Sequence, residues 1–410
     1  MKTKKLLLSL AFCTGSILLG FSQAPKVASL KVGAAKTDIT PAANALPQGY
    51  TSIHDKLFCR AIVIDNGQSS AALIAIDQGV IPNDLYSKVT TQLEKELGIP
   101  ALNIFIAASH THSAPRGGAN LDQLVVAAVK QAKSQLKPAK MSYHTGESYL
   151  NVNRDVINPT TRLWSQGPNY EGPSDKTLAV IKFTDLNGQP IAVYYNYAMH
   201  ANMMFMGGAI SADFPGEASK YVEEYYGNNV LAMFSSGAAG DQNPISVRPM
   251  QDISRKKTDD LLAKGKAKDL NEAIMMAGFG GGSDLVIDPK ILARQTQMIT
   301  SMGQVMGEEI LRVMDLPQKS EAEINIQASQ KTITCPGRTR TNTGREGTEG
   351  TYVDGDPVNI KLSLLKLGDV ALAGVNAEVY NPIAIRLKKE SPINYTIFSS
   401  ITKGSANSGY

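Results

Sequence analysis

Short apolar runs alternate along most of this chain with longer stretches in which apolar residues recur at helical spacing. The runs 60–65 and 71–76 are separated by an Asn-Gly pair, which predicts a β-hairpin. The stretch 83–97 carries a leucine or valine at every fourth position and is followed by a glycine, which predicts a helix. Because the strand-then-helix order repeats, we expect an α/β fold, a mixed and partly parallel sheet with flanking helices and β-hairpins. Further strands are predicted at 103–108, 178–183, 191–196, 230–234, 358–366, 370–374 and 395–401, and further helices at 121–136, 215–226 and 293–314.

Composition indicates a folded globular chain, and its length allows either one large α/β domain or two smaller ones. With 43% hydrophobic and 19% charged residues among 410, the chain is unlike disordered, collagen-like or coiled-coil sequences. The stretch 246–289 differs from its surroundings, because its first half is charged and helical and its end is rich in glycine. We interpret 246–289 as a surface excursion inserted into one domain that covers 25–410.

The first 24 residues have the parts of a secretion signal: a basic start, an apolar run and a small residue at the end. Residues 1–24 therefore predict a secreted or periplasmic protein. The apolar run is shorter than the ~18 residues that span a bilayer, and no later segment approaches that length, so we expect no transmembrane segment. Cys13 lies within the run and leaves a lipid-anchored form as an alternative.

The charge balance gives no reason to expect a nucleic acid as partner. The chain has 41 basic and 37 acidic residues, and three of the basic ones lie in the predicted signal. The remaining chain is nearly neutral and lacks the excess of positive charge that attracts nucleic acids or anionic membrane surfaces. Beyond the signal, Cys59 and Cys335 are compatible either with one disulfide or with two buried thiols.

Polar residues gather directly after several predicted strands. Three of the five histidines do so: His110 and His112 follow the run 103–108, and His200 follows 191–196. Glu378 follows 370–374. In α/β sheets ligands bind beyond the carboxyl ends of strands, and histidine with carboxylate is a ligand set that suits zinc. We therefore predict a zinc site at these strand ends; the alternative is that each histidine is a satisfied polar residue.

Two further residues have two interpretations each. Asp241 follows a Gly-Ala-Ala-Gly sequence and either orients a ligating histidine or forms a tight turn. Arg154 either holds a polar group of a substrate or lies on the surface. The sequence contains no Gly-x-Ser-x-Gly elbow, P-loop or dinucleotide-binding fingerprint, so serine hydrolase, NTPase and Rossmann dehydrogenase activities lack support.

These motifs occur in an order and spacing that resemble a known family. The chain is similar to the N-terminal catalytic domain of the neutral/alkaline non-lysosomal ceramidases over nearly its whole length beyond the signal, except at 246–289. The matching segments are 32–41, 54–55, 109–113, 153–154, 167–173, 197–200, 210–216, 237–244 and 376–378.

The resemblance implies a secreted zinc-dependent amidohydrolase that cleaves the N-acyl bond of ceramide to a sphingoid base and a fatty acid. Its partner is then a ceramide-like lipid amide, with peripheral contact to membrane lipid. By position, the resemblance implies that the zinc ligands are His110, His200, Glu378 and Tyr410. It also implies that His112 is the catalytic histidine, that Arg154 lines the polar end of the substrate pocket, and that Gly49 is the active-site glycine.

The chain departs from the family pattern in two places. Asn243 stands where the ceramidases have an active-site serine, and an amide is not a nucleophile. The chain ends at Tyr410, so we expect no immunoglobulin-like C-terminal domain. Attack by a metal-bound water needs no serine, and Asn243 is then expected to donate a hydrogen bond to the oxyanion or to a substrate hydroxyl. The alternatives are a zinc hydrolase of another acyl amide or ester, and an inactive ceramidase-like binding protein.

Overall fold

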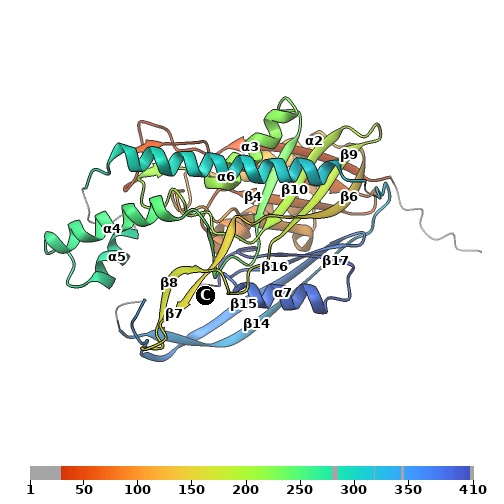
Figure 1. The fold of residues 1–410 in the computed structure, drawn as a ribbon. Helices are drawn as coiled ribbons and strands as arrows, with labels where there is room; N and C mark the ends of the chain where they lie inside the picture. The colour runs from red at the N-terminus through yellow and green to blue at the C-terminus, as the bar shows by residue number, and fades with distance from the viewer. Residues whose placement is uncertain (1–28, 279–284, 318, 343–345, 407–410) are drawn as a thin grey trace, which may run out of the picture.

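A large mixed sheet forms the centre of the computed structural model, which describes residues 29–278, 285–317, 319–342 and 346–406 (Figure 1). The order of its strands is β12, β10, β9, β6, β1, β3, β4, β5. Neighbouring strands pair antiparallel except β4 with β5 and β10 with β12, so the sheet is mixed and partly parallel, as predicted. In chain order the strands are β1 (Lys31–Asp38), β3 (Phe58–Asp65), β4 (Ser70–Ile76), β5 (Ile104–Ala108), β6 (Lys137–Glu147), β9 (Thr177–Asp185), β10 (Pro190–Tyr197) and β12 (Leu231–Ser236).

A second, four-stranded sheet packs against one face of the first. Side chains from both sheets, among them Ile62, Phe105, Leu365 and Leu372, share one buried apolar cluster. Figure 1 shows this second sheet below the first. It is formed by β14 (Ile326–Arg340), β15 (Tyr352–Leu367), β16 (Val370–Val375) and β17 (Tyr395–Ser399). Smaller sheets join β2 (Ser52–Ile53) with β11 (Ala209–Ile210), and β7 (Asn151–Ile157) with β8 (Trp164–Asn169) and β13 (Gln242–Pro244).

Helices cover the opposite face of the large sheet. α1 (Asn83–Leu97) and α2 (Leu121–Ser134) pack on β3, β4 and β5, while α3 (Asp213–Tyr225) and α6 (Pro289–Asp315) pack on β9, β10 and β12. The approach of α2 to β1 is close, because a Cβ atom at Gly33 would lie 2.1 Å from the carbonyl oxygen of Ala132. α7 (Asn381–Glu390) packs beside β17 in the second sheet.

The segment 246–289 contains α4 (Arg248–Ala263) and α5 (Leu270–Gly278), which pack on each other, while α4 also contacts α6. In Figure 1 both helices project to one side of the layered body. Cys59 is buried, Cys335 is half-buried, and both are free thiols. Among the described helices, none combines the length and the apolar character needed to cross a bilayer. The predicted signal 1–24 lies outside the described residues.

Candidate metal centre

Polar turns that follow three different strands meet at one place. His110 and His112 come after β5, His200 after β10, and Glu378 after β16 of the second sheet. Although β5 and β12 are the edge strands of the large sheet, they contact each other, so the sheet curves and brings its strand ends together. Because of this curvature, the histidines that follow β5 lie close to the histidine that follows β10, although these strands are far apart in the strand order.

The backbone holds the His-Thr-His segment firmly. A parallel bridge joins Thr111 to Ala201, and the His112 N–H donates to the Ala201 carbonyl at 2.9 Å. The Thr111 hydroxyl donates to the Ser211 carbonyl at 2.7 Å. His110 adopts a left-handed backbone with φ of 62°, a conformation that costs free energy in a non-glycine residue and often occurs at functional sites.

Two histidines present the same ring nitrogen to one carboxylate. The Nδ1–H of His110 donates to the Gly79 carbonyl at 2.7 Å, and the Nδ1–H of His200 donates to the Gln242 carbonyl at 3.1 Å. Each Nε2 atom then lies 3.4 Å from a carboxylate oxygen of Glu378. A backbone carbonyl that accepts from one ring nitrogen and leaves the other free to bind is the usual support of a metal-ligating histidine.

His112 is the third imidazole of the cluster. Its Nε2 atom lies 3.4 Å from Nε2 of His110, and its ring centre lies 5.3 Å from that of His200. The edge of its ring packs against Phe205 with the centroids 5.3 Å apart. The three imidazoles are one of two groups in the described part of the chain that could hold a metal ion.

The pKa values of the cluster differ by residue. Burial alone would raise the pKa of Glu378, but His110 and His200 hold it well below its usual range. Burial and the charge of Arg154 lower the pKa of His200 to about 4, and burial with the two neighbouring imidazoles lowers the pKa of His112 strongly. The pKa of His110 is raised, because the carboxylate of Glu378 outweighs the effect of burial. Ionised carboxylate and neutral imidazole are the protonation states that bind metal.

The spacing of the cluster fits a metal ion. Two ligands of a tetrahedral zinc ion lie about 3.4 Å apart when each is about 2.1 Å from the metal. The distances from Glu378 to His110 and to His200 are both 3.4 Å. In addition, the Oε2 atom of Glu378 is buried without a hydrogen-bond partner in the described structure. The donor set and its spacing therefore suit a divalent metal.

Arg154 and Asn243 lie together beside this cluster. Arg154 is on β7 and Asn243 is on the adjacent strand β13, and both are buried. The Oδ1 atom of Asn243 accepts from Nη1 of Arg154 at 3.4 Å and from Nδ2 of Asn202 at 3.3 Å. In both of these hydrogen bonds the amide oxygen of Asn243 is the acceptor. Its amide nitrogen can therefore donate a hydrogen bond to a ligand.

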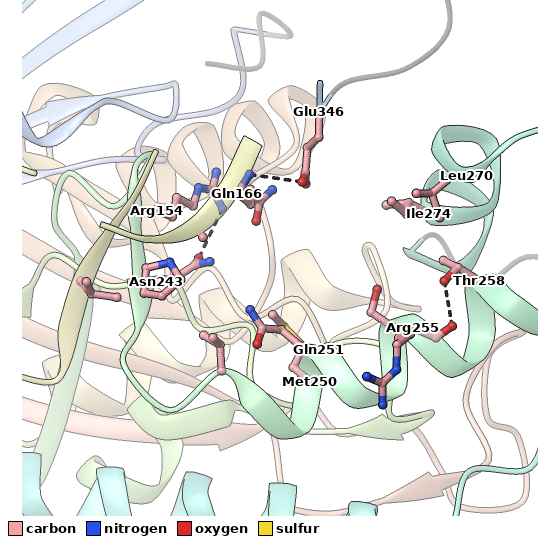
Figure 2. A pocket seen from close by; sticks show the side chains of 15 residues that line it. Arg154, Gln166, Asn243, Met250, Gln251, Arg255, Thr258, Leu270, Ile274 and Glu346 are labelled. Atoms are coloured by element: carbon pink, nitrogen blue, oxygen red, sulfur yellow. Dashed lines mark hydrogen bonds between the residues drawn. The ribbon is translucent and has the colours of Figure 1, made fainter. Parts of the chain in front are cut away.

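A cavity of about 300 Å³ opens next to these two residues. Figure 2 shows Arg154 and Asn243 on one side of it and the apolar side chains of Leu270 and Ile274, from α5, across from them. Glu346 accepts from the backbone N–H of Gln166 at 3.2 Å and contributes to the lining. The helices of the segment 246–289 thus form one wall of the cavity.

Two other predicted residues, Gly49 and Asp241, do not join the cluster in the described structure. Gly49 has a left-handed φ of 91° in the loop before β2, and no hydrogen bond in the described chain links it to the histidines. Tyr410 lies outside the described residues. The Asp241 carboxylate accepts from Asn153 Nδ2 at 2.9 Å and from the Asn381 N–H at 2.8 Å, so it ties β7 to the start of α7.

Some supporting groups have no clear signal in the sequence. The carbonyls of Gly79 and Gln242 are backbone groups that any residue type provides, so composition cannot reveal them. Phe205 is recognisable only once its contact with His112 is known. Asn202, two residues after His200, is the one that sequence reasoning could have found, since alternate residues share a face in extended chain.

The similar proteins of known name are neutral ceramidases. No family model matches the sequence. The chain is 26% identical to the neutral ceramidase of Drosophila melanogaster over 318 residues, which are 66% of this chain and 45% of that protein. It is 28% identical to the neutral ceramidase of Pseudomonas aeruginosa over 276 residues, which are 58% of this chain and 41% of that protein. These alignments span less than half the length of either relative.

Solved structures share the fold. The neutral ceramidase structure from Pseudomonas aeruginosa superposes with a TM-score of 0.67 at 18% identity, covering 93% of this chain and 68% of the other. A structure described as ceramidase complexed with C2 gives the same TM-score and covers 92% of this chain. The chain is thus similar in sequence to neutral ceramidases over more than half of its length, and it shares the fold of the solved neutral ceramidase structure.

Proposed function

We propose that this chain is a zinc-dependent amidohydrolase that cleaves the N-acyl amide bond of ceramide-like lipids to a sphingoid base and a fatty acid. The observation that carries the proposal is the cluster of His110, His200 and Glu378, with its metal-like spacing, beside the cavity that Arg154 and Asn243 line. Its sequence relatives are named neutral ceramidases, which supports an amide substrate. We also propose secretion or export to the periplasm, based on the signal predicted at 1–24.

His110, His200 and Glu378 are the residues that would hold the zinc ion, and Tyr410 remains a predicted fourth ligand. When bound, zinc would supply a water whose pKa is lowered to about 7 and a positive charge beside the amide carbonyl. Hydrolysis then needs a proton to reach the leaving nitrogen as the carbon–nitrogen bond breaks. We assign the proton transfer to His112, which would take the proton released by the attacking water and pass it to the leaving nitrogen, because its Nε2 atom lies 3.4 Å from that of His110 and thus next to the ligands.

Arg154 and Asn243 are assigned to substrate positioning. Arg154 is almost fully buried and lines the cavity, where it can hold polar groups of a lipid amide. Arg154 and Asn202 both donate to Oδ1 of Asn243, which fixes the amide so that its nitrogen can donate to the carbonyl oxygen or to a substrate hydroxyl. The apolar side chains across the cavity are expected to contact the hydrocarbon part.

The first test is the metal content of the purified chain, measured by inductively coupled plasma mass spectrometry, together with hydrolysis of a labelled ceramide. We expect zinc to be bound and ceramide to be cleaved, and we expect His110→Ala and His200→Ala to lose both zinc from this centre and activity. His144→Ala is the matched control, since His144 lies on β6 and its Nδ1 contacts only its neighbour Thr145 among the described residues. A folded chain that takes up no zinc when zinc is supplied would contradict the proposal.

Two other results would point to the alternatives. If zinc is bound but ceramide is untouched, a panel of acyl amides and esters tests for another substrate. If none of these is hydrolysed, a lipid-binding protein on this scaffold is the second candidate function. The observation that favours it is Asn243, which cannot act as a nucleophile at the position of the family's serine.

A further inference from the structure

A second group of metal-ligating side chains lies where the loop after β2 meets the first turns of α3. It consists of His54, Asp55 and Glu217, whose ligand atoms all lie within 4.8 Å of one another. The Nε2 atom of His54 is 3.6 Å from Oδ2 of Asp55, close to the 3.4 Å spacing found in the candidate metal centre. The two groups share no residue.

This second group contains unsatisfied polar atoms. The Nε2 atom of His54 is buried and has no hydrogen-bond partner within the described ranges. Two carboxylates lie next to it, and Glu217 is buried on α3. Burial raises the pKa of Asp55 to about 7, and the nearby charge of Glu217 adds to the increase, although Ser211 and the Ala212 N–H donate to its oxygens. A cation between the three side chains would pair the nitrogen and remove the carboxylate repulsion.

We propose that His54, Asp55 and Glu217 form a second divalent cation site. One imidazole with two carboxylates suits an ion of the Zn²⁺ or Mn²⁺ type. The three side chains leave coordination positions for water, as in sites with an incomplete set of protein ligands. The proposal stands on this cluster alone and does not depend on the proposed hydrolase function.

The position of this second cation site gives it a structural role. The Ser211 hydroxyl donates to Oδ2 of Asp55, and the Ser211 carbonyl accepts from Thr111, which lies between His110 and His112. A cation bound by Asp55 and Glu217 would therefore fix the start of α3 against the loop and, through Ser211, support the segment that carries the two histidines.

The ammonium group of Lys220 lies close enough to this site to compete with a bound cation for Glu217. Its Nζ atom lies 3.8 Å from Oε2 of Glu217, one turn along α3, and its side chain is mostly exposed. Its charge also lowers the pKa of His54, after the larger effect of burial, so the ammonium lies within electrostatic range of the ring. Removal of this ammonium group should strengthen cation binding, which separates a metal site from a simple His–Asp pair.

The test is equilibrium dialysis of the full chain against Zn²⁺ alone and Mn²⁺ alone, with bound metal counted by mass spectrometry. We expect Glu217→Gln and His54→Ala each to bind one ion fewer than the wild type. Lys220→Met should bind as many ions as the wild type and lower the Kd of the second ion by at least about threefold. Thermal melts by circular dichroism identify folded variants, and Glu217→Gln preserves side-chain shape if His54→Ala does not fold.

The proposal is overturned if folded Glu217→Gln binds as many Zn²⁺ and Mn²⁺ ions as the wild type. It is also overturned if Lys220→Met weakens binding of the second ion or leaves it unchanged. The result is independent of the candidate metal centre, because His200→Ala should remove a different ion from the one lost in Glu217→Gln. If Glu217→Gln loses an ion and His200→Ala does not, the result would support this second site and contradict the zinc centre of the proposed function.

Discussion

Asn243 is the residue on which the proposed mechanism depends most directly. Its Oδ1 atom accepts from Arg154 and Asn202, so the side chain is held in one orientation at the edge of the cavity. A serine at this position would carry a hydroxyl group that can act as a nucleophile. The asparagine side chain instead has an N–H donor and no nucleophilic group. The residue is therefore suited to stabilise negative charge on the carbonyl oxygen.

Replacement of Asn243 tests this role directly. We expect Asn243→Ala to lower kcat for amide hydrolysis by about tenfold or more, because removal of one oxyanion donor typically costs that much or more. KM should change less, since the hydrogen bond strengthens in the transition state. Steady-state kinetics of wild type and variant give both constants. Unchanged kcat in the variant would remove Asn243 from the mechanism.

At the scale of residues, the sequence predicted the side chains that follow strands and missed those brought in by tertiary structure. His110, His200 and Glu378 each follow an apolar run, so their strand-end position was visible, and the structure brings them together. His54 follows no apolar run and has no spacing that suggests a metal ligand, and its neighbour Glu217 lies on a helix far along the chain. Only the packing of α3 beside the β2 loop brings those two residues together.

At the scale of elements, the local sequence pattern predicted many of the apolar and amphipathic elements, although not the partly buried strand β1. The hairpin of β3 and β4 and the helix α1 match the predictions, because turn residues and leucine spacing mark their ends. The strands β6 and β14 were missed. Their exposed faces carry many polar residues, and they gain stability from pairing with β9 and β15 rather than from a continuous apolar run.

The helices α4 and α5 form the wall of the cavity opposite Arg154, and under the proposed function this wall would affect substrate specificity. Leu270 and Ile274 lie one turn apart on α5, and both line the cavity. Leu270 is 56% exposed, so its side chain is accessible to a ligand in the cavity. We infer that this apolar stripe contacts the hydrocarbon of the substrate.

A charge placed on this stripe should weaken binding of long-chain substrates. We expect Ile274→Asp to raise KM for a long-chain amide by about three- to tenfold with little change in kcat, since a lost apolar contact is worth about 1 kcal/mol or more. Leu262→Asp is the control, because Leu262 is a partly exposed residue of α4 that does not line the cavity. Equal effects of the two changes, or none at Ile274, would show that the hydrocarbon binds elsewhere.

At the scale of the whole molecule, the candidate metal centre is a junction between the two sheets. His110 and His200 follow strands of the large sheet, whereas Glu378 follows β16 of the second sheet. The sheets share one apolar cluster, so their packing does not depend on metal alone. A metal ion would nevertheless add a link between segments distant in sequence and would bind only the folded chain.

Removal of metal should therefore lower the thermal stability of the whole molecule. We expect a chelator to reduce the Tm by about 3 °C for each ion removed, since a ligand at 100 times its Kd stabilises the folded state by about 2.7 kcal/mol. Added Zn²⁺ should restore the Tm of the wild type. His200→Ala with Glu217→Gln, which lacks both proposed sites, should melt at the same temperature with chelator and with Zn²⁺. Differential scanning calorimetry measures these shifts. If the double variant responds to Zn²⁺ as the wild type does, the stabilising ion binds at neither site.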